Sequence, residues 1–175
     1  MSTGIPFVIS QKKLRKRIKK ARKQVKKVTV AEAACNPLLA DFFGTLCSLV
    51  QTAGLEDTLN SQETKFTVFA PTNASFAALP QATLNAVTTD VDLLTDVLLF
   101  HTFQGGRIRA KKLTDDRELT MANGEITKTT RESRLKIYQS GPGNSDGDLP
   151  RIILPNVFVS NGMIHGVNGV LLPDL

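Results

Sequence analysis

The sequence predicts an α+β fold: helices in the first part of a folded body and strands in the second. Apolar residues recur at helical spacing from about residue 29 to residue 100, whereas after His101 short alternating segments follow, separated by Gly and Asn. Because the helices precede the strands instead of alternating with them, the order is typical of α+β domains. A basic cluster precedes the body, and the 175 residues suit one domain, 29–175, with an extension, 1–28.

Residues 1–28, called here the basic arm, carry half of the positive charge of the chain. Eleven of the 22 Lys and Arg residues lie between positions 12 and 27, and the first acidic residue is Glu32. From there on, 11 basic residues face 16 acidic ones, so the body has a net charge of −5 although the whole chain has +6. The basic residues of the arm are Lys12, Lys13, Arg15, Lys16, Arg17, Lys19, Lys20, Arg22, Lys23, Lys26 and Lys27.

The arm also contains an apolar stripe at helical spacing, so we expect a basic amphipathic helix that stands apart from the body. Repulsion between like charges four residues apart predicts that this helix is mostly unfolded in isolation and forms on an anionic surface. Three interpretations stay open: binding to a membrane surface or an acidic polysaccharide, a solvated tail, or a presequence that is removed. Residues 8–41 contain no aromatic residue, which does not favour nucleic acid. The stripe consists of Leu14, Ile18, Ala21, Val25 and Val28.

In the body, a helical region is expected at residues 29–53, split at Pro37 and closed by Gly54. A short turn at 55–59 and a buried strand at 66–70 follow, and Thr72 or Asn73 is expected to cap the next helix. Two more helices are expected, at 81–87 and after a cap at Asp90 or Asp92. Strands are expected at about 107–109, 118–121, 125–129, 134–138, 152–153, 157–160 and 163–172, with a hairpin loop at 140–149.

The sequence offers little catalytic chemistry. It has no nucleophile elbow and no phosphate-binding Gly-rich loop. His101 and His165 have no further ligand at metal-binding spacing, so each is interpreted as a buried histidine with a satisfied hydrogen bond, and we expect no metal, no cofactor and no enzyme activity. Cys35 and Cys47 are more simply explained as two buried thiols; the alternative is a disulfide, which would imply an oxidising compartment.

Three segments of the body together resemble the fasciclin-like (FAS1) domain family. Residues 66–76, FTVFAPTNASF, resemble its first signature; residues 97–103, VLLFHTF, its Tyr-His segment; and residues 161–173, NGMIHGVNGVLLP, its closing strands. The resemblance covers about residues 29–175. It implies a wedge-like β-sandwich with helices packed around it, in which residues 66–76 and 161–173 share one core.

The resemblance also implies adhesion or protein binding without catalysis, and a secreted or surface location. In some animal members the Tyr-His region is linked to integrin binding, so the contact candidates are Leu98, Leu99, Phe100 and His101. Phe100 occupies the tyrosine position, and the chain has no Arg-Gly-Asp. Structural roles are expected for Thr72, Asn73 and His165, and favoured for His101.

We therefore expect a fasciclin-type adhesion or protein-interaction module whose arm binds an anionic partner. The alternative is a structural subunit of a larger complex, anchored by the arm. No secretory signal is visible, because the basic cluster lacks a following apolar stretch. An extracellular or cell-surface location thus stands beside a plastid, mitochondrial or membrane-peripheral one.

Overall fold

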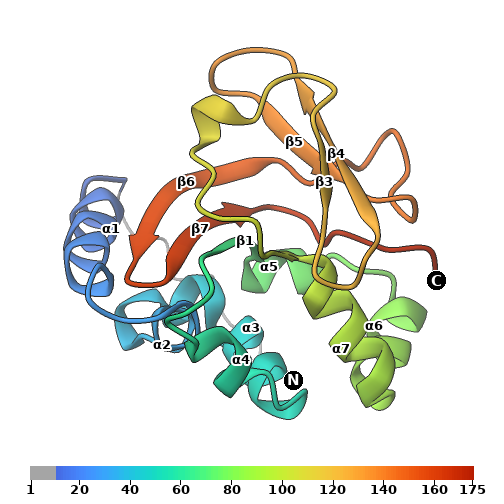
Figure 1. Ribbon diagram of the computed structural model, residues 1–175, viewed down its shortest axis with the longest axis horizontal. Helices are drawn as coiled ribbons and strands as arrows, with labels where there is room; N and C mark the ends of the chain where they lie inside the picture. Colours follow the sequence, from blue (N-terminus) through green and yellow to red (C-terminus); the bar gives the residue numbers. More distant parts are fainter. Residues whose placement is uncertain (1–10) are drawn as a thin grey trace.

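The computed structural model describes residues 11–175, so the first ten residues of the basic arm lie outside the described residues. It confirms the α+β class: in Figure 1, helices α2 to α7 lie below two sheets. The helices are α1 (Gln11–Val25), α2 (Val30–Ala34), α3 (Ala40–Thr52), α4 (Glu56–Asn60), α5 (Asn73–Ala77), α6 (Gln81–Thr89) and α7 (Val91–Phe100), with the 3-10 helices η1 (Pro37–Leu39) and η2 (Ala110–Lys112). The strands are β1 (Phe66–Pro71), β2 (Thr102–Phe103), β3 (Glu118–Thr120), β4 (Ile126–Arg131), β5 (Ile137–Ser140), β6 (Ile152–Val159) and β7 (Gly162–Val167).

The two sheets bring distant parts of the sequence together. The four-stranded sheet has the order β2-β1-β7-β6, and the three-stranded sheet the order β3-β4-β5. β1 and β7 are parallel neighbours, with Phe66 opposite Gly162 and Val68 opposite Ile164. The first and third segments of the family resemblance therefore do share one core.

Buried apolar side chains form two clusters. The larger one lies where the helices meet the four-stranded sheet and includes Phe43, Leu94 and Ile164. The second includes Phe69 of β1 and Ile137 of β5, so it draws its members from both sheets. This second cluster forms the interior of the β-sandwich. Its apolar side chains lie on the faces that the two sheets turn toward each other, where they are removed from water.

Local signals explain where several helices begin and end. Thr72, and not Asn73, caps α5, since its side chain accepts a hydrogen bond from Ser75 N. Asp90, and not Asp92, caps α7 in the same way. Gly54 has a positive φ of 67° and comes right after Ala53, the C-cap of α3, where glycine is the common residue.

Cys35 and Cys47 form a disulfide, so the favoured interpretation of two free thiols is wrong. Their sulfurs are 2.03 Å apart and their Cα atoms 5.0 Å apart. Cys35 caps the end of α2, and Cys47 lies in α3. The turn through η1, which begins at Asn36 and Pro37, folds α3 back against α2 and brings the two cysteines together.

The expected strands differ from the observed ones in several places, and the one expected at 163–172 ends at Val167. Residues 107–109 form no strand; the side chain of Arg107 instead donates to the carbonyls of Val159 and Gly162 at 3.2 Å each. Residues 134–136 belong to a turn before β5. The segments at 152–153 and 157–160 join into the single strand β6, whose register shifts between Leu154 and Val157. This β-bulge explains why the alternation of apolar and polar residues breaks there.

The helix of the basic arm does not stand apart from the body. α1 lies against β6 and η1, at the left edge of Figure 1. Ala21 and Val25 of its apolar stripe are fully buried, and Arg22 donates from Nη2 to Pro155 O at 2.8 Å. Arg17 forms an ion pair of 2.7 Å with Asp41. Ile18 and Val28 pack against the same core, so this part of the stripe is a docking face whose apolar side chains are removed from water by the body.

Candidate functional site

The contact candidates at the end of α7 are mostly inside the protein. Leu98, Phe100 and His101 are 4%, 0% and 1% exposed, whereas Leu99 is half-buried. The three buried side chains therefore expose almost no surface for direct contact with a partner. Their burial follows from the position of α7, whose apolar side chains belong to the buried core.

His101 holds two parts of the core together. Its Nδ1 donates to Val97 O at 2.7 Å, and its Nε2 accepts from Leu171 N at 2.9 Å. One donor and one acceptor correspond to a neutral ring. Burial lowers the pKa of His101 to about 4, although the bond to Val97 O acts in the opposite direction.

His165 of β7 has the same kind of environment. Its Nδ1 accepts from Asn156 N at 3.1 Å, and its Nε2 donates to Ile108 O at 2.7 Å. Burial lowers the pKa of His165 to about 4, against the effect of the bond to Ile108 O. The ring also stacks on Phe69 at 5.7 Å between centroids. Both ring nitrogens are engaged, so the residue serves the fold.

Thr72 and Asn73 connect β1 to the helices. Thr72 caps α5 through its side chain. Asn73 donates from Nδ2 to Ala40 O at 3.0 Å and accepts at Oδ1 from Thr45 N at 2.9 Å. The amide of Asn73 therefore fastens α5 to α3, since it occupies backbone groups of that helix.

The basic residues of the arm are mainly on the outside of α1 and of the turn after it. Arg17 and Arg22 are half-buried, and the remaining nine are exposed. Because the apolar stripe fixes the rotation of the helix, the exposed cations keep a defined orientation toward solvent. They are Lys12, Lys13, Arg15, Lys16, Lys19, Lys20, Lys23, Lys26 and Lys27.

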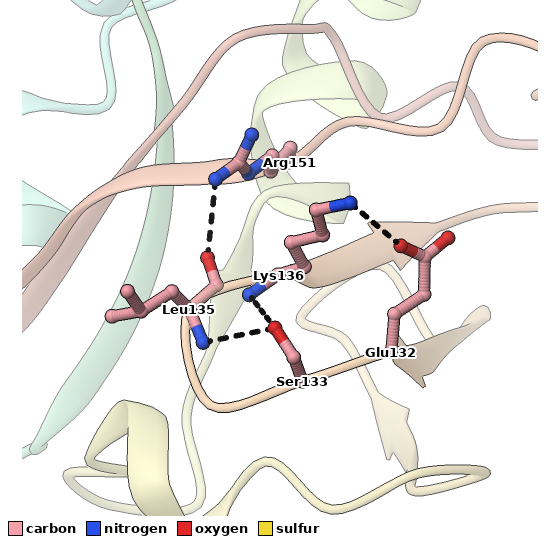
Figure 2. Close-up of polar contacts among 5 residues, drawn as sticks. All are labelled: Glu132, Ser133, Leu135, Lys136 and Arg151. Carbon is pink, nitrogen blue, oxygen red and sulfur yellow. Dashed lines mark hydrogen bonds and ion pairs between the residues drawn. The ribbon is translucent and has the colours of Figure 1, made fainter.

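The turn between β4 and β5 presents an exposed leucine that the sequence patterns did not single out. Leu135 is 78% exposed. Figure 2 shows how its turn is held: Ser133 Oγ accepts from Leu135 N at 3.4 Å and from Lys136 N at 3.2 Å, and Arg151 Nη2 donates to Leu135 O at 3.3 Å. Lys136 also forms an ion pair of 3.6 Å with Glu132. The sequence signal for this turn is Ser133, which stands between two charged residues, because a serine hydroxyl can close a turn by accepting hydrogen bonds from the backbone N–H groups that follow it.

Among residues 11–175, no three His, Cys, Asp or Glu side chains gather in a group that suits a metal ion. The described helices include none with the length and apolar character of a membrane span.

Comparison with known proteins places this geometry in a family. The family model for the fasciclin domain matches residues 41–173. Protein sll1483 of Synechocystis sp. is 31% identical over 150 residues, which cover 85% of this chain and 75% of that protein. Immunogenic protein MPB70 of Mycobacterium bovis is 32% identical over 142 residues, which cover 81% of this chain and 66% of that protein. The cell surface glycolipoprotein MPB83 of the same species is 31% identical over 146 residues, which cover 82% of this chain and 60% of that protein. The chain therefore spans less than two thirds of both mycobacterial proteins.

A solved structure has the same fold. The FAS1 domain pair of the insect cell adhesion molecule fasciclin I aligns with a TM-score of 0.66 at 16% identity, over 85% of this chain and 52% of that chain. The family model covers well over half of the sequence, and the paired strands β1 and β7 lie within the matched residues. This chain belongs to the fasciclin domain family.

Proposed function

We propose that this chain is a non-enzymatic adhesion or protein-interaction module that binds an anionic partner through α1. The observation that carries the proposal is the exposed cationic face of α1, which its buried stripe fixes to the body. A helix held in this way presents its charges without having to fold on binding, so less conformational entropy is lost. An anionic membrane surface and an acidic polysaccharide are the candidate partners.

The relatives support a role at the cell surface. One is named a cell surface glycolipoprotein, and the solved structure comes from a cell adhesion molecule. The disulfide between Cys35 and Cys47 favours an oxidising compartment, in which such bonds persist. The protein partner of such a module would have Leu99 available among the candidates at the end of α7.

The histidines support a role without catalysis. A general base needs a ring nitrogen within reach of a substrate. His101 and His165 are buried, and both nitrogens of each ring are occupied by the backbone.

The experiment compares the full chain with a neutral-arm variant, in which the nine exposed cations of the arm are replaced by Gln. Deletion of residues 1–28 would uncover the core beneath Ala21 and Val25, whereas Gln preserves the helix. Binding is measured by co-sedimentation with phosphatidylserine vesicles, heparin beads and polyglutamate beads. The full chain should bind at least one of them at low salt and release it at high salt, and the variant should not bind.

Substitution of Lys111 and Lys112, two exposed lysines of the body, by Gln is the control and should leave binding unchanged. Equal binding by the neutral-arm variant and the full chain would contradict the role of α1. If the full chain binds none of the probes at low salt, the anionic-partner proposal is wrong.

A further inference from the structure

We propose that a cleft between α1 and the bulge of β6 binds the sulfate or phosphate ester groups of an anionic polysaccharide. This inference rests on the proposed function and names the ligand class of the same helix. The cleft has a volume of about 420 Å³. Its lining comes from both elements: Lys19, Arg22, Lys23, Lys26, Asn156 and Phe158.

The bulge of β6 builds one wall of the cleft. The register shift between Leu154 and Val157 places Pro155 and Asn156 outside the regular pairing with β7. Pro155 O accepts from Arg22, which holds α1 against the strand. Asn156 has a φ of 58°, and its Oδ1 accepts from Ala110 N at 2.9 Å. The amide of Asn156 is thereby fixed, and its Nδ2 group is left as a donor for a ligand.

The charge of the cleft has one sign. Four of the described lining residues are cations, and none is acidic. Arg22 is half-buried, and its Nε is shielded from water without a hydrogen-bond partner among the described groups. Burial lowers the pKa of Arg22, because its charge loses solvation that no carboxylate replaces. A bound oxyanion would compensate this charge, since charge-assisted hydrogen bonds are among the strongest in proteins.

The cations also form a line. Lys12, Lys16, Lys19 and Lys23 follow one another at steps of four, three and four, which places them on one stripe of α1, and Lys26 lies in the turn directly after the helix. At a rise of 1.5 Å per residue the part of the stripe from Lys12 to Lys23 is about 17 Å long. A second cavity, of about 480 Å³, touches the same stripe and shares Lys19 with the cleft. A linear track of charge that runs into a cleft fits an extended polyanion better than a flat bilayer does.

Phe158 distinguishes a saccharide from other polyanions. Its side chain is half-buried and forms part of the wall, and the guanidinium of Arg109 lies 5.3 Å from its ring centroid. The C–H face of a sugar ring packs against an aromatic face, whose quadrupole is negative. Inorganic phosphate or a polyphosphate has no such face, so Phe158 adds affinity only for a saccharide.

Isothermal titration of the full chain with a sulfated heparin tetrasaccharide tests the cleft. The variant Lys23→Gln/Lys26→Gln removes two charges from its wall. The matched variant Lys20→Gln/Lys27→Gln removes two exposed charges that line neither cavity. The cleft variant should bind about tenfold more weakly than the full chain, and the matched variant less than about threefold, because only the first loses direct contacts.

A substitution without any change of charge tests the saccharide. Phe158→Leu should weaken binding of the tetrasaccharide several-fold and leave binding to phosphatidylserine vesicles unchanged, and a desulfated tetrasaccharide should not bind. Equal losses in the two lysine variants, or no effect of Phe158→Leu, would overturn the cleft, while the neutral-arm experiment would still support α1. Binding to vesicles alone would replace the polysaccharide with a membrane, and binding to no polyanion would overturn both proposals.

Discussion

His101 shows how a single residue of the Tyr-His segment acts through the core. The substitution His101→Ala removes the bonds to Val97 O and Leu171 N and leaves a cavity. We expect a loss of about 3 kcal/mol in the free energy of unfolding, measured by urea denaturation. Leu99→Ala is the control: the side chain is half-buried, so the loss should be below about 1 kcal/mol. Equal stability of His101→Ala and the unsubstituted protein would contradict the structural role.

For single residues, the sequence predicts which side chains can cap a helix or join the core, but it does not predict how deeply each one is buried or which backbone groups it reaches. Thr72 and Asn73 are both good caps, and only the backbone decides that Thr72 caps α5 while Asn73 reaches α3. Leu98 and Leu99 are chemically identical in the sequence, and the packing of α7 buries one more deeply than the other. A family resemblance transfers the positions of residues but not their exposure, which explains why the contact candidates include buried residues.

Among the elements, the disulfide joins the end of α2 covalently to α3. Its sequence separation is 12 residues. Cys35→Ser/Cys47→Ser should lower the free energy of unfolding by about 3 kcal/mol, because the unfolded chain regains the entropy of an open loop. Urea denaturation of this variant, and of the unsubstituted protein with dithiothreitol, measures the effect. Dithiothreitol should have no effect on the variant, and equal midpoints for the two proteins would mean that the bond adds no stability.

The docking of α1 makes a second prediction about an element. Ala21→Glu places a carboxylate in a fully buried position, which should detach the helix from β6. Free of the body, a short helix of like charges is unstable, so far-UV circular dichroism should lose the helical signal of α1. Lys20→Glu introduces the same side chain at an exposed position and should keep the signal. A normal spectrum for Ala21→Glu would show that the stripe does not hold the helix.

The elements that the sequence predicted best are those with a single clear signal. Pro37 splits the helical region and Gly54 closes it as expected, and β1 follows from a short apolar run that ends at Pro71. β6 was divided into two segments, because its bulge interrupts the alternation that identifies a strand. The disulfide depends on how far α3 folds back, and that angle is a tertiary property.

For the molecule as a whole, two features with different origins meet at β6. The strand completes the sheet that the family resemblance predicts, and its bulge receives a helix that the resemblance does not include. The apolar stripe of the arm was visible in the sequence, but the site on which it docks was not, because the bulge and Pro155 O exist only in the folded sheet. The cleft therefore could not be predicted from either part alone.

The two buried histidines make the stability of the whole molecule depend on pH. The pKa of each is lowered from 6.5 to about 4 in the folded protein. As the pH falls below about 6.5, the unfolded chain binds protons that the folded protein does not, so the free energy of unfolding decreases until about pH 4, by about 3 kcal/mol per histidine. Urea midpoints measured across this window should fall steadily. His165→Gln, which cannot titrate, should reduce the slope.

Carboxylates also titrate near the lower end of this window, so the histidines need a direct observation. The Cε1–H resonances of His101 and His165 in proton NMR spectra report their own protonation. In the folded protein both resonances should keep the chemical shift of a neutral ring from neutral pH down to about pH 5. The reason is that the acceptor nitrogen of each ring, Nε2 in His101 and Nδ1 in His165, already accepts a hydrogen bond from a backbone N–H. A midpoint near the ordinary histidine value for either resonance would mean that its ring is open to water, and the pH dependence of stability would then have another source.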